Sequence, residues 1–332
     1  MTETRHDVVA IGNAIVDIIG RCDDAFLGKH GLAKGSMALV DTPAMQKLYG
    51  DMGPAVEISG GSAANTMVGI ASLGGKAGFI GKVADDELGR IFCHDIGAAG
   101  VTYATPRAKN SLPTARCLIL VTPDGERTMN TFLGVSPELN HGEVDARLIE
   151  GARITYLEGY LFDRAEAKAA FRQATAIARK AGRQTALTLS DGFCVGRHRA
   201  EFLSLIRDGV DILFANENEI TALYETTSFD EAAKSAAKDT KLAVLTRSAK
   251  GSLILSGGES VSVAAAPVPT VVDTTGAGDL YAAGFLFGLS HGRPLDVCGH
   301  LGSLAAAEII SHVGARPETS LAKLAREKGL LS

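Results

Sequence analysis

The stretch Val272-Asp273-Thr274-Thr275-Gly276-Ala277-Gly278-Asp279 decides how the rest of this sequence is interpreted. An unbroken apolar run from Leu280 to Phe287 follows it, so the stretch predicts a turn that opens a buried helix. The free amides of residues 276–278 would then attract an anion to the helix N-terminus. Asp279 adds a carboxylate beside that anion site, which suits phosphoryl transfer to a hydroxyl group. A tight glycine turn with a stabilising first-turn aspartate is the alternative interpretation.

The composition excludes several classes of protein. The chain has 332 residues, is 46% hydrophobic and 21% charged, and carries a net charge of −5, which argues against nucleic-acid binding. Five scattered cysteines without a Cys-x-x-Cys pair indicate reduced thiols, and the eight histidines show no zinc-binding spacing. With no apolar leader at the N-terminus and no apolar run of about 18 residues, we expect a cytoplasmic protein without membrane contact.

The predicted elements indicate an α/β fold. From about Asp145 onward strands and helices alternate, which predicts a mostly parallel sheet covered by helices on both faces. The first third instead contains short strands, and Pro123-Asp124-Gly125 predicts a hairpin between strands 115–121 and 127–132. These segments predict a small, separate β-element attached to the main sheet. Gly-x-Gly-x-x-Gly and P-loop motifs are absent, so any bound nucleotide is held by another architecture.

Two polar groups in the first third are candidates for binding a polyhydroxy substrate. Gly60-Gly61 lies between a strand and a helix and allows a ligand close to the backbone, with Asn65 on the first helical turn. The alternative for this motif is a glycine turn with a capping residue. Asp17 lies in an apolar strand, and a buried acid needs a partner, either a substrate hydroxyl or a local backbone amide.

Two further motifs follow predicted strands in the second half. Asn216 and Glu219, at the carboxyl end of a strand, offer the oxygen ligands that suit Mg²⁺, although the same residues also cap helices. The turn Thr246-Arg247-Ser248-Ala249-Lys250-Gly251 is rich in hydroxyl groups and could hold phosphate or form only a hairpin loop.

Together these motifs resemble the ribokinase-like (PfkB) carbohydrate and nucleoside kinase family. Gly60 to Asn65 is similar to its first signature, Asp273 to Asp279 to its second, and Asn216-x-x-Glu219 to its magnesium motif, all in the family's order. Gly12-Asn13-Ala14-Ile15-Val16-Asp17-Ile18 gives the strongest likeness, within the family, to adenosine kinases. The resemblance implies one kinase domain over residues 1–332, with a β-sheet lid from about 14–58 and 107–137.

The resemblance also implies a role for each motif. Asp279 would be the general base, with an anion hole formed by Gly276, Ala277 and Gly278. Groups expected to contact the substrate are Asn13, Asp17, Gly61, Ser62, Asn65 and Arg127, together with an apolar slot of Leu39, Phe132, Leu133 and Leu161. The slot residues could equally form the lid core. Groups expected on the ATP side are Asn216, Thr246, Ser248, Gly251, Thr275, Gly276 and Gly278.

The implied reaction uses ATP and Mg²⁺, the latter bound near Asn216 and Glu219 through water. Potassium near Asp273 and Thr275 is a further expectation. The leading interpretation is a kinase that converts adenosine to AMP, and the alternative is a PfkB kinase for fructose, ribose or a related sugar. A non-catalytic sugar or nucleotide binder on the same scaffold is a third. The expected partners are these small molecules alone, and the protein would be a monomer or a homodimer.

Overall fold

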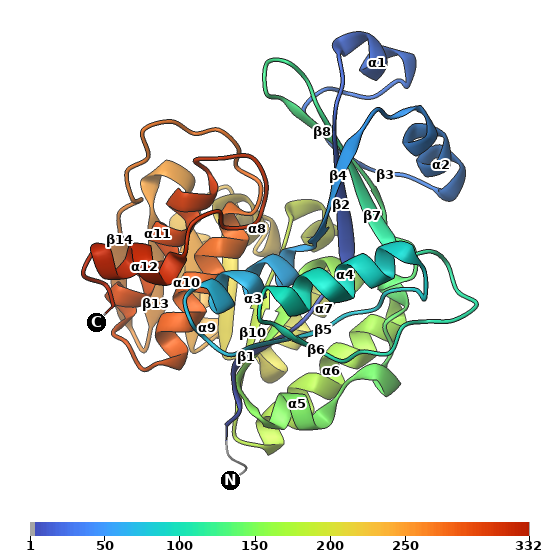
Figure 1. Cartoon of the computed structure of the whole chain (residues 1–332). Coiled ribbons are helices and arrows are strands. Elements are labelled where there is room, and N and C mark those ends of the chain that lie inside the picture. The colour runs from blue at the N-terminus through green and yellow to red at the C-terminus, as the bar shows by residue number, and fades with distance from the viewer. Residues whose placement is uncertain (1–3, 332) are drawn as a thin grey trace.

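The computed structural model describes residues 4–331, and nine strands of this part of the chain form a large sheet (Figure 1). Its strands run parallel except at one edge, where β12 (Leu242–Thr246), β13 (Ser252–Ser256) and β14 (Glu259–Val263) pair antiparallel. The order across the sheet is β14 (Glu259–Val263), β13 (Ser252–Ser256), β12 (Leu242–Thr246), β11 (Ile212–Asn216), β10 (Gln184–Thr188), β9 (Ala152–Glu158), β1 (His6–Ile11), β5 (Ala77–Ile80) and β6 (Thr102–Tyr103).

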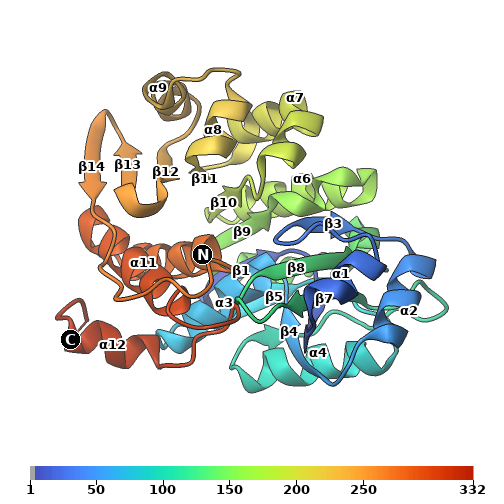
Figure 2. The same cartoon turned by 90° about the horizontal axis from the view of Figure 1, so that it is seen from above.

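Helices cover both faces of the large sheet, as the alternation of strands and helices predicted (Figure 2). One face carries α3 (Ser62–Ser72), α10 (Ala277–Ser290) and α11 (Leu295–Ile309), with α12 (Leu321–Glu327) outside them. The other carries α5 (Ala146–Glu150), α6 (Ala165–Lys180), α7 (Gly192–Gly209), α8 (Glu217–Leu223) and α9 (Phe229–Asp239). Because successive strand residues point to opposite faces, Val8 and Ala10 join one core and Val9 and Ile11 the other.

A second sheet of five strands projects from the body of the molecule (Figure 1). Its order is β3 (Met37–Leu39), β8 (Arg127–Phe132), β7 (Ala115–Val121), β2 (Ile15–Arg21) and β4 (Ala55–Gly60). Helices α1 (Asp24–Lys29) and α2 (Thr42–Asp51) lie in the connections of this small sheet, and α4 (Glu87–Ala98) packs against β2 and β4. The predicted hairpin is confirmed, because β7 and β8 pair antiparallel with Val121 opposite Arg127.

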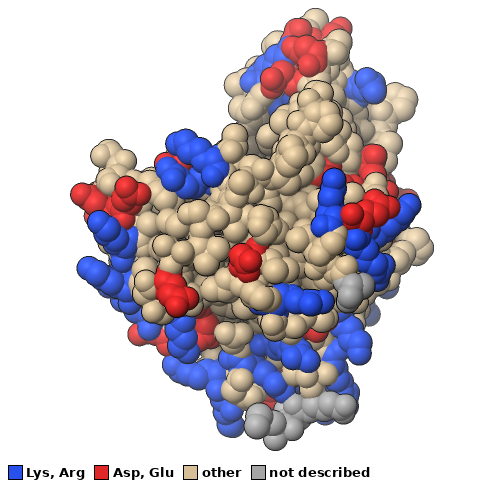
Figure 3. All heavy atoms as spheres, turned by 90° about the vertical axis from the view of Figure 1, so that its left-hand side faces the viewer, with Lys and Arg blue, Asp and Glu red and all other residues tan. Residues whose placement is uncertain are grey.

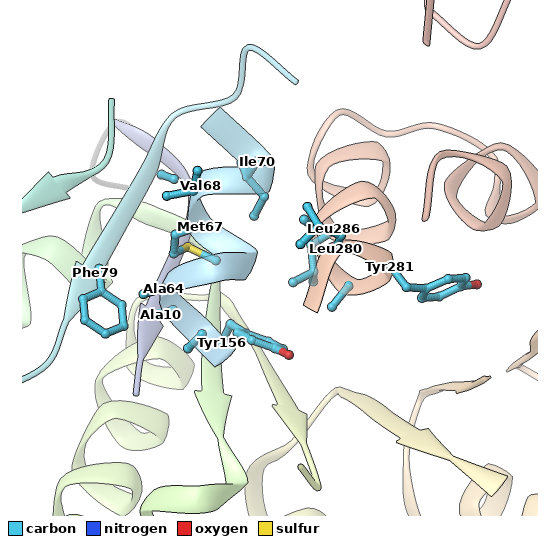
Figure 4. Close-up of a cluster of buried hydrophobic side chains, with 14 of the residues drawn as sticks. Ala10, Ala64, Met67, Val68, Ile70, Phe79, Tyr156, Leu280, Tyr281 and Leu286 are labelled. Carbon is cyan, nitrogen blue, oxygen red and sulfur yellow. The ribbon is translucent and has the colours of Figure 1, made fainter. Parts of the chain in front are cut away.

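Close packing of α3 against α10 brings the two glycine-rich motifs together. Figure 4 shows Met67 and Ile70 on α3 facing Leu280 and Leu286 on α10. At Gly69 an added Cβ would lie 2.6 Å from the Cβ of Ala283, so only glycine permits this separation. The helix contact therefore fixes the distance between the two N-termini.

Several elements differ from the sequence-based expectation. Helix α7 begins at Gly192, capped by Asp191, and non-helical dihedrals at His198 produce a kink in it. Helices α5, α9, α11 and α12 and strands β6 and β14 were not predicted individually. Short or alanine-rich segments such as α9 carry a weak apolar signal, and their position depends on packing against the finished sheet.

The surface carries no broad region of one charge on the face with the C-terminal helices. Figure 3 shows basic side chains near the lower edge and acidic ones between them, with a mostly uncharged centre. Within residues 4–331, no helix has both the length and the apolar character that crossing a membrane requires.

Candidate active site

Asp279 lies in the first turn of α10 and points at the N-terminus of α3. Its Oδ1 accepts a hydrogen bond from Ser62 Oγ at 2.6 Å, and its Oδ2 accepts one from Asn65 Nδ2 at 3.0 Å. Burial raises the pKa of this carboxyl group above its usual value, and these two donors partly offset the rise. The site thus holds a fixed, partly exposed carboxylate with increased basicity.

The turn before α10 and the first turn of this helix provide unpaired amides. Gly276 is the N-cap, in a left-handed conformation with φ 79°, and no side chain caps the helix. The amide of Ala277 donates to the carbonyl oxygen of Thr274 at 3.2 Å. The sequence placed this amide in the anion hole, but in the structure it is already paired. The amides of Gly276 and Gly278 have no acceptor in the described chain, and no atom lies within 4 Å of a Cβ built on Gly278.

Asp17 and Asn65 provide unpaired oxygens beside Asp279. No amide or side chain of residues 4–331 donates to the Asp17 carboxylate, so the local-amide alternative is not observed. Burial raises the pKa of Asp17 to about 6, although Arg316 and Arg127 counteract it. The Oδ1 atom of Asn65 is buried and lacks a partner. A hydroxyl-rich ligand would supply the missing donors.

Glu158, at the carboxyl end of β9, is a central residue to which sequence analysis assigned no role. It is 1% exposed and accepts hydrogen bonds from Asn13 N, Asn13 Nδ2 at 2.7 Å and Ala63 N at 2.8 Å. Asn13 Oδ1 in turn accepts from Ser136 Oγ at 2.9 Å. The expected substrate ligand Asn13 is therefore 2% exposed and is bonded through both ends of its amide to the protein. An acid at the end of an apolar strand was the available sequence signal.

The titration of Glu158 gives a prediction about stability. Burial raises its pKa to about 7, so the folded protein binds a proton that the unfolded chain, with a pKa near about 4.3, releases. Stability from this group is present at acid pH and is lost as the pH rises through 7. We expect the free energy of unfolding to fall between pH 5 and 8, and Glu158→Gln to flatten this decrease. Urea unfolding at four pH values, for the wild type and the variant, measures this pH dependence of the free energy of unfolding.

The exposed Glu166 in the first turn of α6 offers the matched control. Glu166→Gln should leave the pH dependence of unfolding unchanged. An unchanged slope in Glu158→Gln as well would contradict the assignment of this titration to Glu158.

Arg127 connects the small sheet to the turn before α10. Its Nη1 lies 2.6 Å from Asp273 Oδ2 and 3.5 Å from Thr275 Oγ1, and its side chain is 7% exposed. Asp273 also accepts hydrogen bonds from Thr275 N, Thr275 Oγ1 and Gly314 N. Arg127 Nε and Nη2 are buried without partners, so the guanidinium retains capacity to bind an anion.

The predicted ATP-side residues lie at the carboxyl ends of neighbouring strands. Asn216 on β11 pairs in register with Thr246 on β12, and Ser248 (φ 50°) and Gly251 (φ 82°) form the following turn. Asn216 and Glu219 form a reciprocal capping box, with Asn216 Nδ2 at 2.6 Å from Glu219 Oε1. Burial raises the pKa of Glu219 to about 7. The pair has the oxygens that Mg²⁺ prefers, but direct coordination would break the capping box, so only a water-mediated contact fits.

The structure separates the members of the expected apolar slot. Leu161 is 1% exposed and belongs to the core of the large sheet, and Phe132 is 5% exposed in the core beneath the small sheet. Leu39 on β3 is 59% exposed, and Leu133 is half-buried. Leu39 is therefore the slot residue with most surface available to a ligand.

Comparisons with known proteins agree with this geometry. Residues 52–321 match the family model described as pfkB family carbohydrate kinase. The adenosine kinase of Sinorhizobium meliloti is 55% identical, with a TM-score of 0.91 over 98% of this chain and 100% of that one. A "probable sugar kinase protein" of Rhizobium etli is 51% identical, with a TM-score of 0.93 over 99% and 100%. The adenosine kinase of Saccharomyces cerevisiae is 25% identical over 92% of this chain and 95% of its own.

The fold and site define a phosphotransferase that acts on a hydroxyl group. The chain belongs to the pfkB family of carbohydrate kinases, whose members phosphorylate sugars or nucleosides with ATP, generally together with Mg²⁺.

Proposed function

We propose that this protein transfers the γ-phosphoryl group of ATP to the primary hydroxyl of a nucleoside, converting adenosine to AMP. The observation that carries the proposal is the Asp279 carboxylate, oriented by Ser62 and Asn65 beside the free amides of Gly276 and Gly278. Asp279 accepts the hydroxyl proton, the oxygen attacks the γ-phosphorus, and ADP leaves. The amides stabilise negative charge on the transferred phosphoryl oxygens.

The remaining polar groups bind and orient the two substrates. Asp17 and Asn65 Oδ1 accept hydrogen bonds from sugar hydroxyls. Gly61 forms the turn that leads to Asn65, and its missing side chain faces the carbonyl oxygen of Asn13. Arg127, with two unpaired donors, contacts the transferred phosphate. Asn216 and Glu219 would hold Mg²⁺ through water, and the ion would supply positive charge to the triphosphate.

The small sheet is, in this proposal, the lid of the domain. Arg127 holds the lid against the turn before α10 through Asp273. Because Asp273 already has this cationic partner, a potassium ion near Asp273 and Thr275 would share the carboxylate with a guanidinium. A comparison of activity in potassium chloride and in tetramethylammonium chloride tests whether potassium is required.

Two observations support a nucleoside as acceptor. Adenosine kinases from S. meliloti and from Anopheles gambiae, the second solved with P1,P4-di(adenosine-5) tetraphosphate, share 55% and 27% identity with this chain. On β3 of the lid, Met37 and Leu39 are 49% and 59% exposed, which provides apolar surface for a base. The R. etli sugar kinase, of similar identity, favours the alternative of a free sugar.

A coupled ADP-release assay separates the two acceptor classes. With Mg-ATP, we expect kcat/KM for adenosine to exceed that for ribose, fructose and ketodeoxygluconate by at least about 100-fold, since a buried base adds several kcal/mol of binding. Inosine and guanosine report on the base itself. A preference for a free sugar would overturn the nucleoside assignment and leave the role of Asp279 intact.

A further inference from the structure

The segment Gly314-Ala315-Arg316, which we call the strap, contacts both glycine-rich motifs. The Gly314 amide donates to Asp273 Oδ2 at 2.9 Å. Ala315 lies against Gly276, where an added Cβ would be 2.9 Å from the Cβ of Ala315. Arg316 extends to the opposite side of the site. Three consecutive residues thus connect the turn before α10 with the start of α3.

Arg316 binds the elbow between β4 and α3 through three hydrogen bonds. Its Nε and Nη2 donate to Ser59 O at 2.9 Å and Ser59 Oγ at 3.1 Å, and its Nη1 donates to Ala64 O at 3.0 Å. Between these anchors lie Gly60, whose Cα faces the Asp17 carboxylate, and Ser62, which donates to Asp279. The guanidinium therefore fixes the segment that contacts both carboxylates, through Gly60 to Asp17 and through Ser62 to Asp279.

The charge of Arg316 has a second consequence. The ionisable groups that face Asp279 from the surrounding elements are mostly acids or neutral tyrosines, and they are Asp17, Glu158, Glu219, Tyr156 and Tyr160. Arg316 is the cation that lowers the pKa of both Asp17 and Asp279. Arg127 also acts on Asp17 but is paired with Asp273. Burial lowers the pKa of Arg316 itself to about 10, so it stays protonated at neutral pH.

We propose that Arg316 is a positioning residue for phosphoryl transfer, which fixes the Ser59–Ala64 elbow and supplies the positive charge that allows Asp17 and Asp279 to be ionised together. This inference rests on the proposed role of Asp279 as the base. It assigns two separable contributions, geometry and charge, to one side chain. Sequence analysis gave no signal for it, because Arg316 follows α11 in an irregular segment.

The two contributions are separated by the pH profile of kcat/KM, measured with Mg-ATP and the best acceptor of the substrate panel. Arg316→Gln retains hydrogen-bond donors but removes the charge, so the acidic limb should move to higher pH by about one unit. Well below this limb the shift corresponds to a loss of about tenfold in kcat/KM, and on the pH plateau above the limb the loss disappears. Arg316→Lys retains the charge but not the three-way bonding. Arg316→Lys should therefore leave the acidic limb of the profile at the wild-type pH and lower kcat at every pH.

The control is Arg199, which also donates to a backbone carbonyl, that of Leu223, at 2.8 Å. Arg199→Gln should leave the profile unchanged. Only variants with a thermal midpoint above the assay temperature are compared, and Arg316→Met is the second neutral variant if glutamine does not fold. An acidic limb at the wild-type pH in a neutral variant, or an equal shift in Arg316→Lys, overturns the inference. An active Asp279→Asn variant would instead overturn the proposed function.

Discussion

Replacement of Asp279 by asparagine is expected to lower kcat by about 10²–10⁴-fold, because the site then has no group to accept the hydroxyl proton. Asparagine has the same shape; its Oδ1 can still accept from Asn65 Nδ2, and its Nδ2 can donate to the Ser62 hydroxyl, so the local geometry should survive. Dissociation constants for ATP and the acceptor should change by less than about threefold. Single-turnover kinetics and calorimetric titration measure the two effects separately.

A first-turn aspartate elsewhere tests the alternative that Asp279 only stabilises its helix. Asp296 lies in the first turn of the neighbouring helix α11 and is exposed. Both Asp→Asn changes weaken the interaction with the helix dipole by about 0.5 kcal/mol. Only the Asp279 change should affect turnover. Near-normal turnover of Asp279→Asn would remove the general-base assignment.

Gly61→Ala is expected to cause a large loss of stability. Gly61 has φ 97°, and a Cβ there would lie 2.2 Å from the carbonyl oxygen of Asn13. That oxygen belongs to the backbone between β1 and β2 and cannot move independently. Positive φ and overpacking together should reduce the free energy of unfolding by about 3 kcal/mol or more, as measured by urea titration.

Gly182 provides the matched control for the backbone contribution. It has φ 68°, and no atom lies within 4 Å of an added Cβ. Gly182→Ala should therefore lose only the strain of a left-handed residue, about 1 kcal/mol. Equal decreases in the free energy of unfolding of the two variants would show that the contact with Asn13 O does not contribute to the loss.

The local sequence was sufficient to locate most elements that form the site. The hairpin strands at 115–121 and 127–132 begin and end where predicted, because turn residues interrupt two apolar runs. The turn ending in Gly276 opens α10 as expected. Individual side-chain roles needed the fold. The sequence left open whether Leu161 and Phe132 line a slot or form a core, and the structure buries both in the core. The Ala277 amide has a backbone acceptor.

Other residues of the site could not have been found from local sequence. Glu158 bonds to Asn13 across 145 positions, and Arg316 bonds to Ser59 across 257. Neither contact leaves a periodic pattern, because each depends on where the sheet edge and the end of α11 lie in the folded chain.

The sequence by itself determined the glycine turns, the apolar strands and the acid at the start of α10, since these follow from backbone freedom and apolar periodicity within a few residues. Only the tertiary structure decided which carboxylates share one site and which cations face them. Packing at Gly69 brings α3 and α10 together, and the strap then places Arg316 beside Asp17 and Asp279. Burial and charge proximity are properties of the assembled chain, so the chemistry of these acids is set there.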